Sequence, residues 1–281
     1  MQYRKHENTY RMGIDIGSTT VKVVLADDKN EIAFARYRRH FSEIKKTVKD
    51  ILKEAKEEIG HAIFSTMITG SGGVALAKAI GVEFIQEVVA TANAVEATAP
   101  QTDVAIELGG EDAKILFLTG GTEVRMNGSC AGGTGAFIDQ MATLLKMSAD
   151  EMDAAAQKAE KTYTIASRCG VFAKSDIQPL LNDGAKRSDV AASVFQSVVN
   201  QTISGLACGK PIKGNVAFLG GPLHFLTELK AAFIRTLNLG PDQIIAPDHS
   251  HLFAASGAAL NNNPEVLISL DNLIEKLSNG I

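Results

Sequence analysis

Two short stretches of this sequence place a carboxylate just before a glycine turn. Asp15 opens "DIGSTTVK" and Glu107 opens "ELGGEDAK". Consecutive backbone N–H groups in such turns can bind phosphate oxygens, and an acidic side chain there can hold Mg²⁺ through water. The candidate phosphate contacts are Gly17, Ser18, Thr19, Thr20, Lys22, Gly109 and Gly110. Either turn alone is equally compatible with an ordinary hairpin.

A third glycine pair follows an apolar run in "FLGGPLHF", at Gly220, Gly221 and Pro222. Glycines at such a point allow a nucleoside to approach the backbone closely. Three glycine turns in this order favour a nucleotide site more strongly than any of them does singly. Asp15 and Glu107 are the candidate catalytic acids. Glu111 either orients the attacking water or a Mg²⁺ shell, or is a solvated turn carboxylate.

Phosphate chemistry does not explain the cysteines in "NGSCAGGTG" and "SRCGVFAKSD". Cys130 and Cys169 each precede a segment that can begin a helix, and the positive end of a helix dipole stabilises a thiolate or a reduced cluster. Two interpretations remain open from spacing alone: buried apolar cysteines, or metal ligands. Cys208, at the end of a long apolar-rich helix, is interpreted as structural.

The elements around these residues indicate an α/β chain with a duplicated pattern. Residues 11–27 and 104–118 each read as strand, glycine turn, strand, and residues 31–40 would complete a meander. Amphipathic or small-residue helices are predicted over 43–60, 86–99, 135–147, 190–210, 251–260 and the tail after Pro264. A strand is predicted to begin at Thr162 and lead into the helix after Cys169.

Composition excludes several classes of function. The 281 residues carry a net charge of −4, with basic residues clustered only at 36–40, so nucleic acid is not an expected partner. No apolar run approaches the ~20 residues of a membrane span, and the first residues lack the apolar core of a signal peptide. Three cysteines without a secretion signal favour the cytoplasm.

The three turns in order resemble the actin-like ATPase superfamily. "DIGSTT" and "ELGGED" are similar to its two phosphate motifs, "FLGGPLHF" to its adenosine motif, and "ATANAVEA" and "AASGAAL" to its connecting helices. The resemblance implies two ribonuclease-H-like domains with ATP or ADP and Mg²⁺ in the cleft between them. The expected division is a leader over 1–11, subdomain I over 12–100 plus 252–281, and subdomain II over 101–251. Glu107 departs from the usual aspartate of the second motif.

The cysteine motifs resemble those of one family, the activators of 2-hydroxyacyl-CoA dehydratases. The related ATPase subunits of benzoyl-CoA reductase are included, and the resemblance covers residues 12–262. That resemblance implies a homodimer in which Cys130 and Cys169 of each chain hold one bridging [4Fe-4S] cluster. It also implies a ferredoxin or flavodoxin donor and a dehydratase-like acceptor in anaerobic metabolism. Gly133 and Thr134, just after Cys130, would approach the nucleotide. Glu111 stands where this family usually has glutamine.

Two rival functions remain open at this point. One is a sugar or carboxylate kinase on the same fold, although no convincing sugar-site aspartate is present. The other is an ATP-dependent assembly or regulatory module without a cluster. The sequence also leads to the expectation that Asp15→Asn leaves stability similar or higher, because two unmatched acids facing one phosphate site would repel each other.

Overall fold

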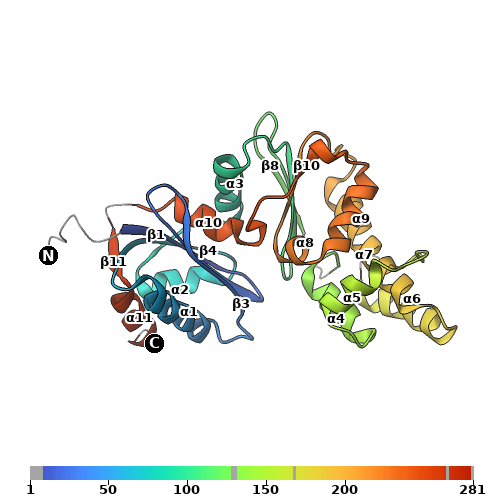
Figure 1. Ribbon diagram of the computed structural model, residues 1–281, viewed down its shortest axis with the longest axis horizontal. Coiled ribbons are helices and arrows are strands. Elements are labelled where there is room, and N and C mark those ends of the chain that lie inside the picture. The colour runs from blue at the N-terminus through green and yellow to red at the C-terminus, as the bar shows by residue number, and fades with distance from the viewer. Residues whose placement is uncertain (1–8, 128–131, 167–168, 264–265, 280–281) are drawn as a thin grey trace. The chain divides into compact units, whose positions relative to one another are not determined.

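The computed structural model describes residues 9–127, 132–166, 169–263 and 266–279. The chain divides into two compact units (Figure 1). Unit 1 comprises the chain up to Pro100 together with the segment from Leu252 onward, and unit 2 runs from Gln101 to His251.

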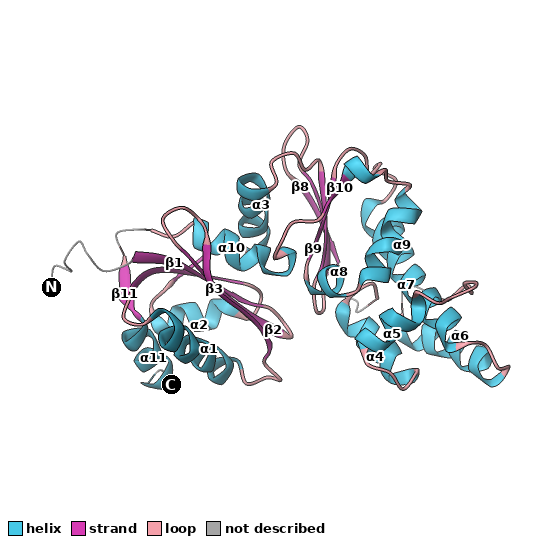
Figure 2. Ribbon diagram, viewed as in Figure 1, coloured by secondary structure: helices cyan, strands magenta, loops and turns pink. Residues whose placement is uncertain are grey.

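Unit 1 is built on a mixed sheet with helices on both faces (Figure 2). Its strands are β1 (Thr9–Ile16), β2 (Thr20–Ala26), β3 (Ile32–Arg39), β4 (Ile63–Thr69), β5 (Glu83–Phe84) and β11 (Leu267–Ser269). Its helices are α1 (Ile44–Ile59), α2 (Gly73–Ile80), α3 (Glu87–Thr98), α10 (Phe253–Leu260) and α11 (Leu270–Asn279).

Alternation along the first two strands decides which side chains enter the core of unit 1. Met12, Ile14 and Ile16 of β1 pack with Val21 and Val23 of β2 in one fully buried cluster, together with α1 and α11. Because successive side chains in a strand point to opposite faces, the residues between them in β1 and β2 face the other side. That side carries α10, which contacts β1, β2 and β4.

The helices α3 and α10 pack against each other at very short range. A Cβ added at Gly257 of α10 would lie 1.7 Å from the carbonyl oxygen of Ala90 in α3. On its other side α10 lies equally close to β1, since a Cβ added at Gly13 would lie 1.8 Å from the carbonyl oxygen of Ala255. Only glycine allows these backbones to approach so closely. The two small-residue segments that resemble connecting helices are therefore a packed pair within unit 1.

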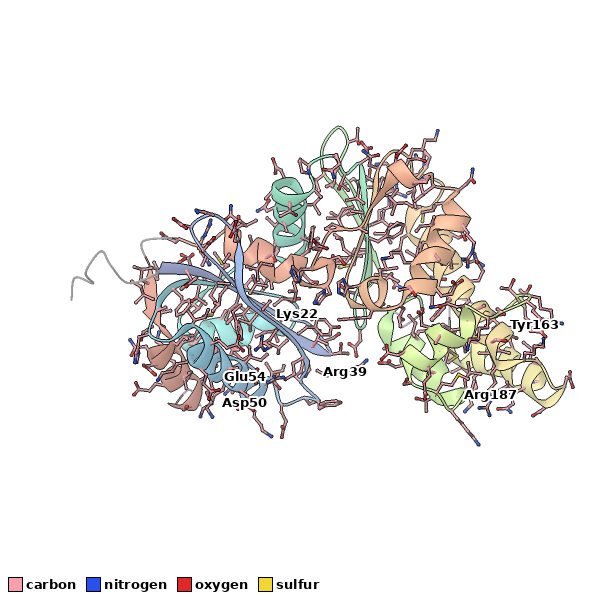
Figure 3. All side chains as sticks on the ribbon, viewed as in Figure 1. Lys22, Arg39, Asp50, Glu54, Tyr163 and Arg187 are labelled. Carbon is pink, nitrogen blue, oxygen red and sulfur yellow. The ribbon has the colours of Figure 1, made fainter. Side chains whose placement is uncertain are left out.

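Two arginines of the basic cluster at 36–40 pair with acidic residues within unit 1. Arg36 and Arg38 of β3 both pair with Glu54 of α1, and Arg36 also pairs with Glu58. Glu54 projects from α1 in Figure 3. These pairs join a helix to its sheet.

Unit 2 repeats the plan with a larger helical layer. Its strands are β6 (Val104–Leu108), β7 (Ala113–Phe117), β8 (Glu123–Asn127), β9 (Val216–Leu219) and β10 (Ile244–Ile245). Its helices are α4 (Gly135–Leu144), α5 (Ala149–Ala156), α6 (Gly170–Asn182), α7 (Arg187–Thr202), α8 (Gly221–Phe225) and α9 (Thr227–Leu237). Short helices of other types span Ile203–Ala207, Pro241–Gln243 and Ser250–Leu252.

The two sheets share one topology, as the duplicated strand–turn–strand pattern predicted. In unit 1, β5, β4, β1, β2 and β3 are neighbours in that order, and in unit 2 the order is β10, β9, β6, β7, β8. Each begins with a three-stranded antiparallel meander. The fourth strand is parallel to the first in both sheets.

Three predicted elements differ from the structure. The strand expected at Thr162 is absent, because residues 161–166 form no regular element. The helix expected over 190–210 begins earlier and continues past Thr202 as a π-helix up to Ala207. The tail forms the short strand β11 on the edge of β4 before α11 begins.

Candidate functional site: two acid–lysine turns

The first glycine turn joins β1 to β2 and places Asp15 directly opposite Lys22. The two residues are register partners in the antiparallel pair, and Lys22 Nζ lies 2.7 Å from Asp15 Oδ2. Asp15 is 2% exposed. Burial opposes the charge of Lys22, but the Asp15 carboxylate outweighs it and raises the pKa of Lys22 well above the ordinary lysine value.

The second oxygen of Asp15 is buried and has no protein hydrogen-bond partner among the described residues. Gly70 lies against it, since a Cβ added at Gly70 would be 2.4 Å from Asp15 Oδ1. A buried carboxylate oxygen without a partner is costly unless water or a cation completes it. The donor set therefore fits a water-linked Mg²⁺, which takes hard oxygen ligands.

The turn is held from three directions. Gly17 donates to Thr20 across the turn at 3.0 Å, and Gly72 donates to the carbonyl of Ile16 at 2.8 Å. The ring of His40, 23 residues away along the chain, contacts the carbonyl of Gly17. These bonds leave Ser18 at the exposed tip.

The second glycine turn joins β6 to β7 and repeats this arrangement. Glu107 and Lys114 are register partners, and Lys114 Nζ lies 3.7 Å from Glu107 Oε2. Lys114 also lies 2.7 Å from Asp112 Oδ2. Lys114 is only 2% exposed, whereas Glu111 at the tip of the turn is exposed. One buried cation thus holds two carboxylates.

The prediction of unmatched acids was wrong, because each candidate acid has its own lysine. Sequence reasoning singled out Lys22 but missed Lys114 and Asp112. A signal was present: "DIGSTTVK" and "ELGGEDAK" both place a lysine seven residues after the acid. In a hairpin whose turn spans four residues, that spacing puts the two side chains opposite each other.

In unit 2, three predicted segments come together around the second turn. The N–H groups of Gly135 and Ala136, at the start of α4, donate to the carbonyls of Gly109 and Gly110 at 3.0 and 2.7 Å. A Cβ at Gly135 would lie 3.3 Å from the ring of Pro222. The start of α4 therefore fastens the second turn beside α8.

The glycines of these segments have identifiable roles. Gly220 has a φ of +88°, and a Cβ there would lie 2.1 Å from the carbonyl oxygen of Leu108. Gly133 has a φ of +81° before Thr134, which is fully buried at the N-cap of α4. Gly221 is the first residue of α8. The second and third turns thus meet within unit 2, while the first turn belongs to unit 1.

Cys169 is the N-cap of α6 and is partly exposed. Its carbonyl accepts from Ala173 at 2.9 Å, which begins the helix. Val171 and Phe172 follow with 71% and 66% of their surface exposed. Asp176 accepts a hydrogen bond from the N–H of Ala166 at 2.8 Å, tying the preceding segment to α6. A thiol in this position lies at the positive end of the helix.

The other two cysteines differ from Cys169. Cys130 lies outside the described residues. Cys208 is exposed, and its thiol donates to the carbonyl of Gly205 at 3.1 Å. Within the described part of the chain, no three His, Cys, Asp or Glu side chains gather closely enough to hold a metal ion.

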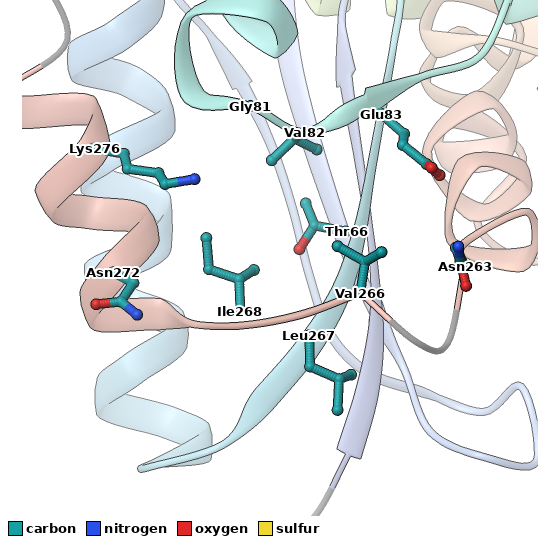
Figure 4. Close-up of a pocket in the computed structure, with 10 residues that line it drawn as sticks. All are labelled: Thr66, Gly81, Val82, Glu83, Asn263, Val266, Leu267, Ile268, Asn272 and Lys276. Atoms are coloured by element: carbon teal, nitrogen blue, oxygen red, sulfur yellow. The ribbon is translucent and has the colours of Figure 1, made fainter. Parts of the chain in front are cut away.

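A cavity of about 260 Å³ lies elsewhere in unit 1, between the C-terminal segment and the loop after α2 (Figure 4). Thr66, Glu83 and Lys276 are among its lining residues. Lys276 donates to the carbonyl of Ile80 at 2.7 Å, so its ammonium group fastens α11 to α2. None of the predicted site residues lines this cavity.

Comparison with known proteins identifies the family of this chain. The profile of the BadF/BadG/BcrA/BcrD ATPase family matches residues 12–261. The chain belongs to this family. It is therefore an ATPase with the actin-like fold. None of the helices in the described ranges has the length and apolar character needed to cross a membrane.

Several similar proteins are named as activators of acyl-CoA dehydratases. The chain is 30% identical to the 2-hydroxyisocaproyl-CoA dehydratase activator of Clostridioides difficile over 257 residues, covering 89% of this chain and 94% of that protein.

Two solved structures are similar over nearly the whole chain. One is component A of the (R)-2-hydroxyglutaryl-CoA dehydratase of Acidaminococcus fermentans, with a TM-score of 0.78, 27% identity and coverage of 96% of this chain and 100% of that one. The other is the Clostridium difficile activator with bound ADPNP, with a TM-score of 0.75, 27% identity and coverage of 97% and 98%.

Proposed function

We propose that this protein is an ATP-hydrolysing iron–sulfur activator that passes a low-potential electron to a partner enzyme of the 2-hydroxyacyl-CoA dehydratase type. The observation that carries the ATP part is the repeated acid–lysine turn, with one buried Asp15 oxygen left for water or Mg²⁺. The relatives named as dehydratase activators support the choice of partner.

The chain's own groups divide the work of hydrolysis. The N–H groups of the turns after Asp15 and Glu107 would bind phosphate oxygens, because such groups form a preorganised anion site. Lys22 would hold the Asp15 carboxylate in one orientation, leaving its other oxygen available to a water molecule of a Mg²⁺ shell. Glu111, exposed at the tip of the second turn, would orient the attacking water.

Cys130 and Cys169 are the proposed cluster ligands, two from each chain of a homodimer. A [4Fe-4S] cluster takes four cysteine thiolates, and one chain has three cysteines, so two copies would complete the set. When bound, the cluster supplies the electron that a ferredoxin or flavodoxin donor has delivered. Cys169 fits this role because it is partly exposed and is the N-cap residue of α6.

Anaerobic purification followed by iron and sulfide analysis tests the proposal. We expect about four irons per two chains, a brown protein, and loss of the cluster in Cys130→Ala and in Cys169→Ala. Cys208→Ala is the matched control and should keep the cluster. A full cluster in Cys169→Ala would exclude this ligand set. A colourless native protein that still hydrolyses ATP would leave only the ATPase.

A further inference from the structure

The imidazole of His40 is buried against the first glycine turn. His40 follows β3 directly and is 6% exposed. Its Nε2 lies 3.1 Å from the carbonyl oxygen of Gly17, and its Nδ1 lies 3.0 Å from the backbone nitrogen of Ser42. A carbonyl can only accept and a backbone N–H can only donate. The ring therefore donates through Nε2 to Gly17 and accepts through Nδ1 from Ser42.

The bond to Gly17 determines where the next N–H points. The peptide between Gly17 and Ser18 is planar and trans, so its carbonyl and its N–H point in opposite directions. A ring that holds the Gly17 carbonyl toward His40 therefore directs the Ser18 N–H away from it, at the exposed tip of the turn. The backbone N–H of His40 also donates to the carbonyl of Thr19 at 3.1 Å, so one residue holds two carbonyls of the turn.

The backbone after His40 is strained in a way that preserves this arrangement. Phe41 and Ser42 have φ values of +45° and +67°, a region that costs non-glycine residues free energy and persists where the surroundings enforce it. This conformation brings the Ser42 N–H onto Nδ1. Phe41 is 82% exposed, so packing of its own side chain does not explain the strain.

We propose that His40 is a positioning residue for nucleotide binding, which holds the Gly17 carbonyl so that the Ser18 N–H is presented to a phosphate of ATP. This inference rests on the proposed assignment of the first turn to the phosphates. It adds a residue that lies outside every glycine motif of the sequence.

Two amide substitutions separate the two hydrogen bonds of the ring. The amide nitrogen of glutamine reaches the place of Nε2 and can still donate to Gly17, whereas the shorter asparagine can serve only Ser42. We expect His40→Asn to raise the KM for ATP about tenfold, the size of one lost hydrogen bond, with kcat within about threefold. His40→Gln should restore the KM to within about threefold of the native value.

The measurements are steady-state ATPase kinetics and calorimetric binding of a non-hydrolysable ATP analogue to anaerobically purified protein, with a melting curve for each variant. His61→Asn is the matched control, since the His61 side chain is 89% exposed, and it should change neither KM nor affinity. A merely structural His40 would lower the melting temperature of His40→Asn without changing its KM, and that result would overturn the inference.

The outcomes also separate this inference from the proposed function. Native KM and affinity in His40→Asn, with ATP still hydrolysed, overturn the role of His40 alone. Absence of ATP binding by the native chain overturns both. If His40→Asn does not fold, His40→Gln decides: affinity near the native value supports the role, and a tenfold loss opposes it.

Discussion

Replacing Asp15 by asparagine should destabilise the protein as well as stop ATP hydrolysis. Asp15 is 2% exposed and its Oδ2 lies 2.7 Å from Lys22 Nζ. The substitution would leave the Lys22 ammonium in a buried position opposite a neutral amide. The structure thus reverses the expectation drawn from the sequence, in which the loss of an unmatched acid carried no cost.

The size of the effect follows from the geometry. Two unit charges 2.7 Å apart at an effective dielectric constant of about 20 attract by about 6 kcal/mol before desolvation. Breaking a buried pair by removing one partner costs about 3–5 kcal/mol, because the other charge stays buried. The amide oxygen of the new asparagine can still accept from Lys22, so we expect the lower end, about 3 kcal/mol less free energy of unfolding.

A double-mutant cycle in urea without nucleotide measures this coupling directly. Asp15→Asn, Lys22→Met and the double variant are compared, and the double variant should recover about 2 kcal/mol relative to the sum of the single ones. The exposed pair of Glu43 and Lys46, at a similar distance of 2.9 Å, serves as control and should show no measurable coupling. ATPase activity of Asp15→Asn is measured in parallel.

Three results would refute this reasoning. Unchanged stability in Asp15→Asn would show that the charge of Lys22 is satisfied without Asp15. Equal coupling in the buried pair and in the exposed control would show that burial does not strengthen the pair. ATP turnover at the native rate in Asp15→Asn would remove the acid from the site.

Three further predictions concern other parts of the chain. Lys114→Met removes the cation between the two acids of the second turn. The uncompensated acids should repel the phosphates and raise the KM for ATP about tenfold, measured by steady-state kinetics. An unchanged KM would show that the charge of Lys114 does not affect phosphate binding. Gly257→Ala should lower the free energy of unfolding by about 3 kcal/mol in urea, because its Cβ would lie 1.7 Å from the Ala90 carbonyl oxygen; Gly120→Ala, whose Cβ meets nothing within 4 Å, should cost only about 1 kcal/mol. Burial, with smaller contributions from neighbouring positive groups, lowers the pKa of His224 below 6.5. The unfolded chain therefore binds more protons as pH falls through that value, and the free energy of unfolding should decrease there. Melting curves of His224→Gln should show a smaller decrease with pH, and an equal decrease would assign the effect to another group.

Much of the local structure could be predicted from the sequence because it depends on short-range patterns. The alternation of apolar residues through Met12, Ile14 and Ile16, followed by a four-residue turn, leaves an antiparallel hairpin as the way to bury one face. The same holds for residues 104–118.

The stretch before Cys169 contains apolar and β-branched residues, but no neighbouring strand in the described part of the chain pairs with it, and a strand without a partner does not form.

The sequence by itself determined the two hairpins, the acid at the end of the first strand of each, and the lysine opposite it, because turn length sets register between adjacent strands. Only the tertiary structure decided what approaches those turns from far along the chain. Gly70 reaches the free oxygen of Asp15, and His40 reaches the carbonyl of Gly17. The start of α4 reaches the second turn through Gly135. These contacts depend on the order of strands and on which helix covers which face, and both are settled by burial of the whole apolar surface at once.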